Sequence, residues 1–121
     1  MKKLKVLDIS NNSLSEHIPA SLQNCKMLES LALSRNNLLG TVPEWIGDLS
    51  MLHILLLRSN NLEGGIPIQL RCLQKLQIID LAMNHLSGPI LQQLSNTSVM
   101  TNKYFTRSRS TRLGSSQYYS D

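Results

Sequence analysis

The chain of 121 residues has few aromatic residues and cysteines and lacks long apolar runs. It contains one Phe, one Trp and three Tyr, which predicts an aliphatic core. No apolar run approaches the roughly 20 residues that a membrane-spanning helix needs. The first residues, MKKLKVLDIS, begin with a basic stretch, but Asp8 interrupts the apolar run that follows, which argues against a signal peptide. The length predicts at most one domain.

The residues that usually carry chemistry form no catalytic or metal-binding pattern. No Ser lies in a G-x-S-x-G elbow, and the Gly64-Gly65 pair belongs to a turn rather than to a phosphate-binding loop. The histidines and cysteines do not show metal-ligand spacing. We therefore expect a protein that is not an enzyme, holds no metal or cofactor, and has no small-molecule substrate.

Positive charge is concentrated at the C-terminal end. The net charge is +4, but residues 1–98 carry eight Lys and Arg against seven Asp and Glu. This balance argues against nucleic-acid binding by that part. Residues 99–121 are basic and rich in Ser and Arg, and we expect them to form a disordered tail. RNA contact through its RSRSTR stretch is an alternative, but a solvated linker is favoured because no aromatic platform accompanies it.

What the chain does have is a repeat. Residues 28–43 read LESLALSRNNLLGTVP, or L-x-x-L-x-L-x-x-N-x-L-x-G-x-V-P. The same pattern recurs every 24 residues without a gap. Its leading leucines are Leu4, Leu28, Leu52 and Leu76. Four repeats therefore cover residues 1–98.

Each position of the pattern has a physical reading. The alternating L-x-L segment predicts a short strand with one buried face. The Asn that follows can satisfy backbone groups left open where the strand ends. Gly permits a left-handed turn, and Pro sets φ for the return path. Since one repeat cannot bury enough surface to offset its ordering, the repeats must stack into a solenoid.

The pattern also predicts the core. In the first repeat we expect Leu4, Leu7, Ile9, Leu14, Ile18, Leu22 and Cys25 to be buried, and in the second Leu28, Leu31, Leu33, Leu38, Val42, Pro43, Ile46 and Leu49. Glu16 stands in the Gly position of the first repeat, so the turn there should be wider than in its neighbours.

The repeat resembles the plant-type leucine-rich repeat, L-x-x-L-x-L-x-x-N-x-L-x-G-x-I-P, as found in the ectodomains of plant receptor-like proteins and receptor-like kinases. The resemblance implies an α/β-type solenoid with a short parallel sheet on its concave face and irregular or 3-10 turns on its convex face. It also implies recognition of a peptide or protein ligand or of a co-receptor, in defence or development, at the cell surface. Two alternatives remain: a truncated receptor fragment without autonomous activity, and an intracellular scaffold or decoy.

In a solenoid, ligands bind at the variable positions of the strands. The exposed positions here combine apolar residues with charged neighbours, a mixture that suits peptide or protein contact. The candidate binding residues are Val6, Asp8, Arg35, Ile54, Leu56, Arg58, Ile78, Asp80 and Met83.

Covalent features are few. Cys25 falls in a core position of the repeat and Cys72 in an exposed one, nearly two repeats away. That separation, roughly 10 Å, exceeds the limit of about 7 Å between Cα atoms for a disulfide, so two free thiols are expected. Asn11 and Asn96 lie in N-x-S sequons and are possible glycosylation sites.

Overall fold

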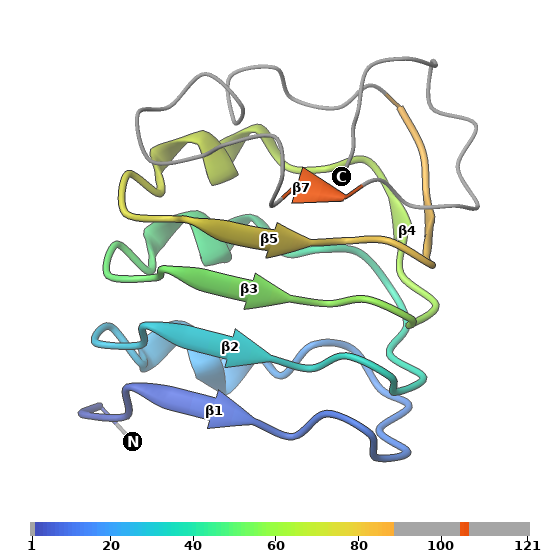
Figure 1. Cartoon of the computed structure of the whole chain (residues 1–121), viewed down its shortest axis with the longest axis horizontal. Coiled ribbons are helices and arrows are strands. Elements are labelled where there is room, and N and C mark those ends of the chain that lie inside the picture. The colour runs from blue at the N-terminus through green and yellow to red at the C-terminus, as the bar shows by residue number, and fades with distance from the viewer. Residues whose placement is uncertain (1, 89–104, 107–121) are drawn as a thin grey trace.

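Each repeat contributes one short strand to a parallel sheet. The computed structural model describes residues 2–88 and 105–106, and the repeat strands are β1 Val6–Asp8, β2 Ser30–Ala32, β3 Ile54–Leu56 and β5 Ile78–Asp80. Leu7 pairs with Leu31, and Leu31 with Leu55. Paired residues are 24 positions apart, so the period of the sequence is also the register of the sheet. The predicted solenoid with parallel strands is confirmed (Figure 1).

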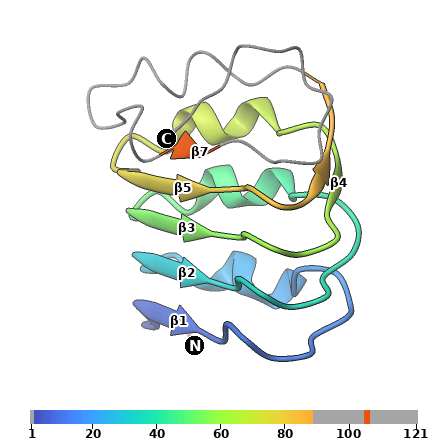
Figure 2. The same ribbon diagram turned by 45° about the vertical axis from the view of Figure 1, so that its right-hand side comes forward.

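The return paths contain short 3-10 helices. These are η1 Ala20–Asn24, η2 Glu44–Asp48 and η3 Ile68–Cys72. Each begins directly after a proline, whose carbonyl oxygen accepts the first hydrogen bond of the helix and whose missing N–H costs nothing at that position. The three helices stack behind the sheet (Figure 2). In the part of the chain that the structure describes, no helix is long and apolar enough to span a bilayer.

A second, two-stranded parallel sheet follows the main one. It pairs β4 Glu63–Gly64 with β6 His85–Leu86, in the turns that leave the main sheet. Nearby, Gly40, Gly64 and Gly88 have φ values between +81° and +84°, a region in which residues with a Cβ are strained. Glu16, at the same position of the first repeat, keeps a negative φ. The first turn therefore differs from the others in its backbone conformation, while its greater width stays a prediction.

The core is a stack of aliphatic side chains. Leu28, Leu31, Leu55 and Leu57 are fully buried, together with most other residues of the predicted columns. Two predictions need correction. In the first repeat only Ile18, Leu22 and Cys25 are buried, whereas Leu4, Leu7, Ile9 and Leu14 are half-buried because another repeat packs on one side of them only. Pro43 is also half-buried, since it lies at the start of the exposed return path.

A continuous hydrogen-bonded ladder of Asn side chains joins the repeats. The Asn60 Oδ1 accepts a hydrogen bond from the Leu38 N–H at 3.0 Å, and its Nδ2 donates to the carbonyl oxygens of Leu33 and Leu57. Those two carbonyl oxygens also accept bonds from Asn36 and Asn84. The three asparagines are buried. Each amide therefore bonds to its own repeat and to the preceding one, as the Asn of the repeat predicts.

The sheet continues beyond β5. Strand β7, Phe105–Thr106, lies parallel to β5 and pairs Phe105 with Ile79, 26 positions earlier. We expected the solenoid to end at residue 98 and the basic Ser/Arg-rich segment after it to be disordered. Phe105 and Thr106 belong to that segment but form β7, so the expectation of disorder is wrong for these two residues. The spacing departs from 24, which explains why the repeat pattern did not reveal the strand. The rest of residues 99–121 lies outside the described residues.

The Asn ladder predicts a position-dependent loss of stability. Asn60→Ala removes three hydrogen bonds and leaves the buried Leu38 N–H without an acceptor, whereas the two carbonyl oxygens each keep one Asn donor. We expect the free energy of unfolding to fall by about 2–4 kcal/mol. The exposed Asn12, whose amide bonds to carbonyl oxygens at the first repeat, is the matched control, with a loss under about 1 kcal/mol. Urea unfolding followed by circular dichroism measures both, and equal losses would contradict the ladder.

Gly47 predicts a second stability effect. It is buried in η2, and a Cβ at this position would collide with the backbone carbonyl oxygen of Gln69 in η3. Gly47→Ala should therefore push the two helices apart and lower the free energy of unfolding by about 1–3 kcal/mol. At Gly65 the nearest atom would be 3.9 Å from the new Cβ, so Gly65→Ala should stay within about 0.5 kcal/mol of the parent chain. Urea denaturation midpoints of the two variants test this difference.

Candidate ligand-binding surface

Six of the predicted binding residues lie on one face of the sheet. Val6, Ile54 and Ile78 occupy the first position of their strands, and Asp8, Leu56 and Asp80 the third. Because side chains alternate along a strand, they point away from the buried middle residues. This surface, here called the sheet face, lies opposite the 3-10 helices (Figure 1).

The sheet face is apolar at its centre. Ile54, Leu56 and Ile78 are half-buried, and Val6 at the first strand is 61% exposed. On β2 the equivalent residues are the smaller Ser30 and Ala32. Half-buried aliphatic side chains leave apolar surface that a ligand can bury.

A charged pair lies at one end of this apolar surface. The Arg58 guanidinium contacts the Asp80 carboxylate, with 3.3 Å between Nη1 and Oδ2. Oδ1 of Asp80 also accepts a hydrogen bond from the Ala82 N–H at 3.1 Å, which fixes the carboxylate at the end of β5. Asp8 makes the same turn bond to the Ser10 N–H. The structure thus brings together two predicted site residues whose pairing the sequence did not indicate.

Three predicted residues lie beyond the strands: Arg58, two residues after β3, and Arg35 and Met83. Arg35 and Met83 have φ values of 57° and 62°, the left-handed conformation that is uncommon outside glycine. The prediction that they occupy strand positions is wrong, because the strands end three residues earlier. The Arg35 N–H donates to the carbonyl oxygen of Arg58 at 2.8 Å, so this turn is bonded to the next repeat. Arg35 and Met83 are both exposed.

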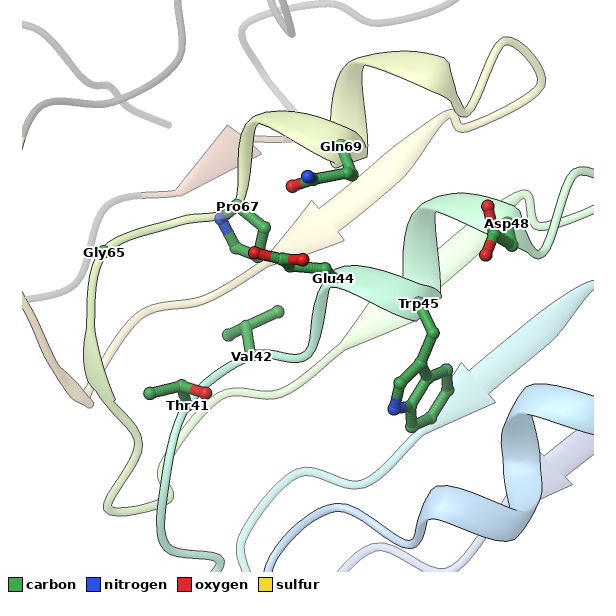
Figure 3. Close-up of a pocket in the computed structure, with 8 residues that line it drawn as sticks. All are labelled: Thr41, Val42, Glu44, Trp45, Asp48, Gly65, Pro67 and Gln69. Carbon is green, nitrogen blue, oxygen red and sulfur yellow. The ribbon is translucent and has the colours of Figure 1, made fainter.

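The opposite side of the molecule carries a groove that the sequence did not predict. It measures about 690 Å³ and lies between η2 and η3 (Figure 3). Glu44 extends toward Pro67, whereas Trp45 points away from η3. The lining residues are Thr41, Val42, Glu44, Trp45, Asp48, Gly65, Pro67 and Gln69. None is a predicted site residue, because those came from the strand positions alone.

The side chains that could bind a metal or be modified are dispersed over the described residues. Within residues 2–88 and 105–106, no group of three or more His, Cys, Asp or Glu is placed to hold a metal ion. Cys25 is buried and Cys72 exposed, as predicted, and both are free thiols. Asn11 is exposed in a left-handed turn, so its sequon is accessible. The other sequon asparagine, Asn96, lies outside the described residues.

Comparison with known families identifies the repeat. The family model of the leucine-rich repeat matches residues 1–38 and 28–86. The chain belongs to the leucine-rich-repeat family. The comparison with curated proteins found no match. The plant-type resemblance of the repeat and the stacked parallel strands are in agreement with this membership.

Solved leucine-rich-repeat structures of plant receptors share the fold. The ectodomain of the receptor kinase SOBIR1 from Arabidopsis thaliana is 34% identical, with a TM-score of 0.82 over 93% of this chain and 59% of that one. The ectodomain of the Arabidopsis receptor kinase HAESA, in complex with the IDA peptide hormone ligand, is 29% identical, with a TM-score of 0.83 over 93% of this chain and 18% of that one. A chain of the BIR3–SERK2 complex from Arabidopsis thaliana is 37% identical, with a TM-score of 0.72 over 79% of this chain and 53% of that one.

These leucine-rich-repeat relatives are longer than this chain. The chain spans about three fifths of the SOBIR1 structure and less than a fifth of the HAESA structure. It aligns with part of the ectodomain of each of these receptor kinases. The prediction of a leucine-rich-repeat solenoid of the plant-receptor type is therefore confirmed.

The Arg58–Asp80 pair predicts a small, salt-sensitive coupling. The two side chains are 42% and 22% exposed, so solvent screens their attraction. A double-mutant cycle with Arg58→Ala and Asp80→Ala should give a coupling free energy of about 0.2–1 kcal/mol, which falls at high salt. Asp80→Ala alone should cost more than Arg58→Ala, since it also removes the bond to Ala82. Denaturation at low and high salt tests both statements, and a salt-independent coupling would contradict the ion pair.

Proposed function

We propose that the chain is a non-enzymatic recognition module that binds a peptide or protein ligand across its sheet face. The observation that carries the proposal is the apolar surface of Ile54, Leu56 and Ile78, which lies beside the Arg58–Asp80 pair. An apolar centre with a polar rim is the usual composition of a protein-binding surface. The sheet face therefore supplies both the contact area and the charges that orient a ligand.

The proposed ligand is extended. The strands are parallel and in register, so equivalent positions of successive repeats form straight columns across the sheet. A ligand that runs along these columns contacts one repeat after another. Its apolar side chains would cover Ile54, Ile78 and Leu56, while a polar or charged group would approach Arg58.

The solved relatives support this proposal by analogy. HAESA binds a peptide hormone with a leucine-rich-repeat ectodomain of the same fold, and BIR3 and SERK2 form a complex with each other. We propose accordingly that this chain acts in receptor signalling at the cell surface, with a peptide ligand, a co-receptor or both as partners. In that compartment Asn11 would be open to glycosylation, near the exposed Val6 and Asp8.

Peptide selection followed by calorimetry tests the sheet face. Random linear peptides displayed on phage are selected on the full chain, and the selected peptides are then titrated against variants. Leu56→Ala combined with Arg58→Ala should raise the Kd by at least about tenfold, which corresponds to about 1.4 kcal/mol.

The control is Ile68→Ala. Ile68 is 53% exposed on η3, opposite the sheet face, so its removal changes exposed apolar area without touching the proposed site. Affinity for the selected peptides should not change in this variant. If the double variant also binds with unchanged affinity, the sheet face is not the ligand site.

A further inference from the structure

All five lysines among residues 2–88 lie in one structural part of the repeat. They occupy the turns that precede the strands, before β1, β2 and β5. Each of the five is exposed. They are Lys2, Lys3, Lys5, Lys26 and Lys75. Because the repeats stack in register, these turns lie above one another and form one edge of the solenoid, at the left of Figure 1. We call this surface the lysine edge.

The backbone of the lysine edge is fixed by hydrogen bonds between repeats. The Lys5 carbonyl oxygen accepts from the Glu29 N–H at 2.7 Å, and the Glu29 carbonyl oxygen accepts from the His53 N–H at 2.8 Å. The His53 carbonyl oxygen in turn accepts from Gln77. The turns are therefore held at the strand spacing of roughly 4.8 Å. Lys3 and Lys75, three repeats apart in the same position of the repeat, are thus separated by roughly 15 Å.

The positive charge of this edge is not neutralised within the described part of the chain. Two carboxylates lie on the same edge, those of the half-buried Glu29 and of Asp48 at the end of η2. Neither forms an ion pair with a lysine; among the described residues the ion pair found is Arg58–Asp80, on the sheet face. The lysine edge therefore keeps an excess of positive charge available to an anionic partner.

Methionines lie between the lysines. The repeat position that holds Lys3 and Lys75 holds Met27 and Met51 in the intervening repeats. Met27 is 42% exposed, and the Sδ of Met51 lies 3.7 Å from the Nζ of Lys75. Methionine side chains adapt to the shapes of apolar groups. A partner that fits the edge therefore presents carboxylates together with apolar side chains, a combination that an acidic polysaccharide lacks.

We propose that the lysine edge is a second interaction surface, which docks an acidic, extended segment of a partner protein. About five extended residues span the roughly 15 Å between Lys3 and Lys75. Acidic side chains of that segment pair with the lysines, and an apolar side chain packs on Met27. This surface is separate from the sheet face, so the inference goes beyond the proposed function and does not depend on it.

The test uses the full chain and a fluorescent synthetic peptide that repeats Asp-Leu-Glu, with binding measured by fluorescence anisotropy at low ionic strength. Replacing Lys3, Lys26 and Lys75 together with Gln should raise the Kd by at least about tenfold. The matched control replaces Arg107, Arg109 and Arg112 with Gln, which removes the same three charges from another segment. The control should change the Kd by less than about threefold.

Two further comparisons identify the kind of partner. Met27→Ser keeps every charge and should raise the Kd for the peptide by about threefold or more, because an apolar contact is lost. Leu56→Ala should leave peptide binding unchanged, which separates this surface from the sheet face. Polygalacturonate and vesicles of phosphatidylserine and phosphatidylcholine serve as anionic probes, because neither presents an apolar side chain to the edge.

Several results would overturn the proposal. Equal losses in the lysine and arginine variants would show attraction by net charge alone. Polygalacturonate or the vesicles could bind more tightly than the peptide, through the lysines and without any effect of Met27→Ser. That result would assign the edge to a polysaccharide or a membrane. Absence of peptide binding to the parent chain would also overturn it. A thermal unfolding midpoint of the lysine variant equal to that of the parent chain establishes that the variant is folded.

Discussion

The buried Asn ladder is the interaction on which the rest of this structure depends. Asn36, Asn60 and Asn84 each satisfy backbone groups of two successive repeats, and the carbonyl oxygens of Leu33 and Leu57 each accept two Asn amides. An amide buried in an aliphatic core is tolerated only when its donors and acceptors are paired. The Asn follows its strand at the same distance in every repeat, so stacked strands bring each Asn beside the backbone groups of the preceding repeat. The ladder therefore fixes the register between neighbouring strands.

That register organises the surfaces as well as the core. A residue type that recurs at one position of the repeat becomes a column on the folded protein. Aliphatic and charged residues at strand positions form the sheet face, whereas lysines and methionines in the preceding turns form the lysine edge. The two surfaces differ chemically: Arg58 on the sheet face has an acidic partner in Asp80, while the lysines have none among the described residues. A rigid scaffold can thus carry two recognition surfaces without conformational change.

Much of the fold follows from the sequence because the repeat is strictly periodic. The strands, the Asn ladder and the burial of Leu28, Leu31 and their equivalents all depend on local pattern and stacking alone. Burial and strand position were predicted less accurately at the two ends of the stack, where a repeat does not have an equivalent neighbour on both sides. Leu4 and Leu7 share the pattern of Leu28 and Leu31, yet they are half-buried because neighbours cover one side only. Strand β7 was missed because its spacing from β5 is not 24 residues.

The candidate site was predictable in part for the same reason. Alternation along a strand placed Ile54 and Leu56 on the sheet face, but it extended the face too far, to Arg35 and Met83, whose left-handed φ values end the strand geometry. Periodicity assigns residues to columns, but it says nothing about distances between side chains of different columns. The contact between Arg58 and Asp80 and the groove between η2 and η3 both depend on such distances.

The amino-acid sequence by itself determined the repeat length, the strand register, the aliphatic core and the choice of an Asn at each strand end. These features need only the order of residues, since each repeat meets an equivalent neighbour. Tertiary structure alone decided which carboxylate pairs with Arg58 and how closely Gly47 approaches Gln69. The physical reason is that these contacts join atoms from different repeats, and their distances depend on how the stacked turns are oriented in space.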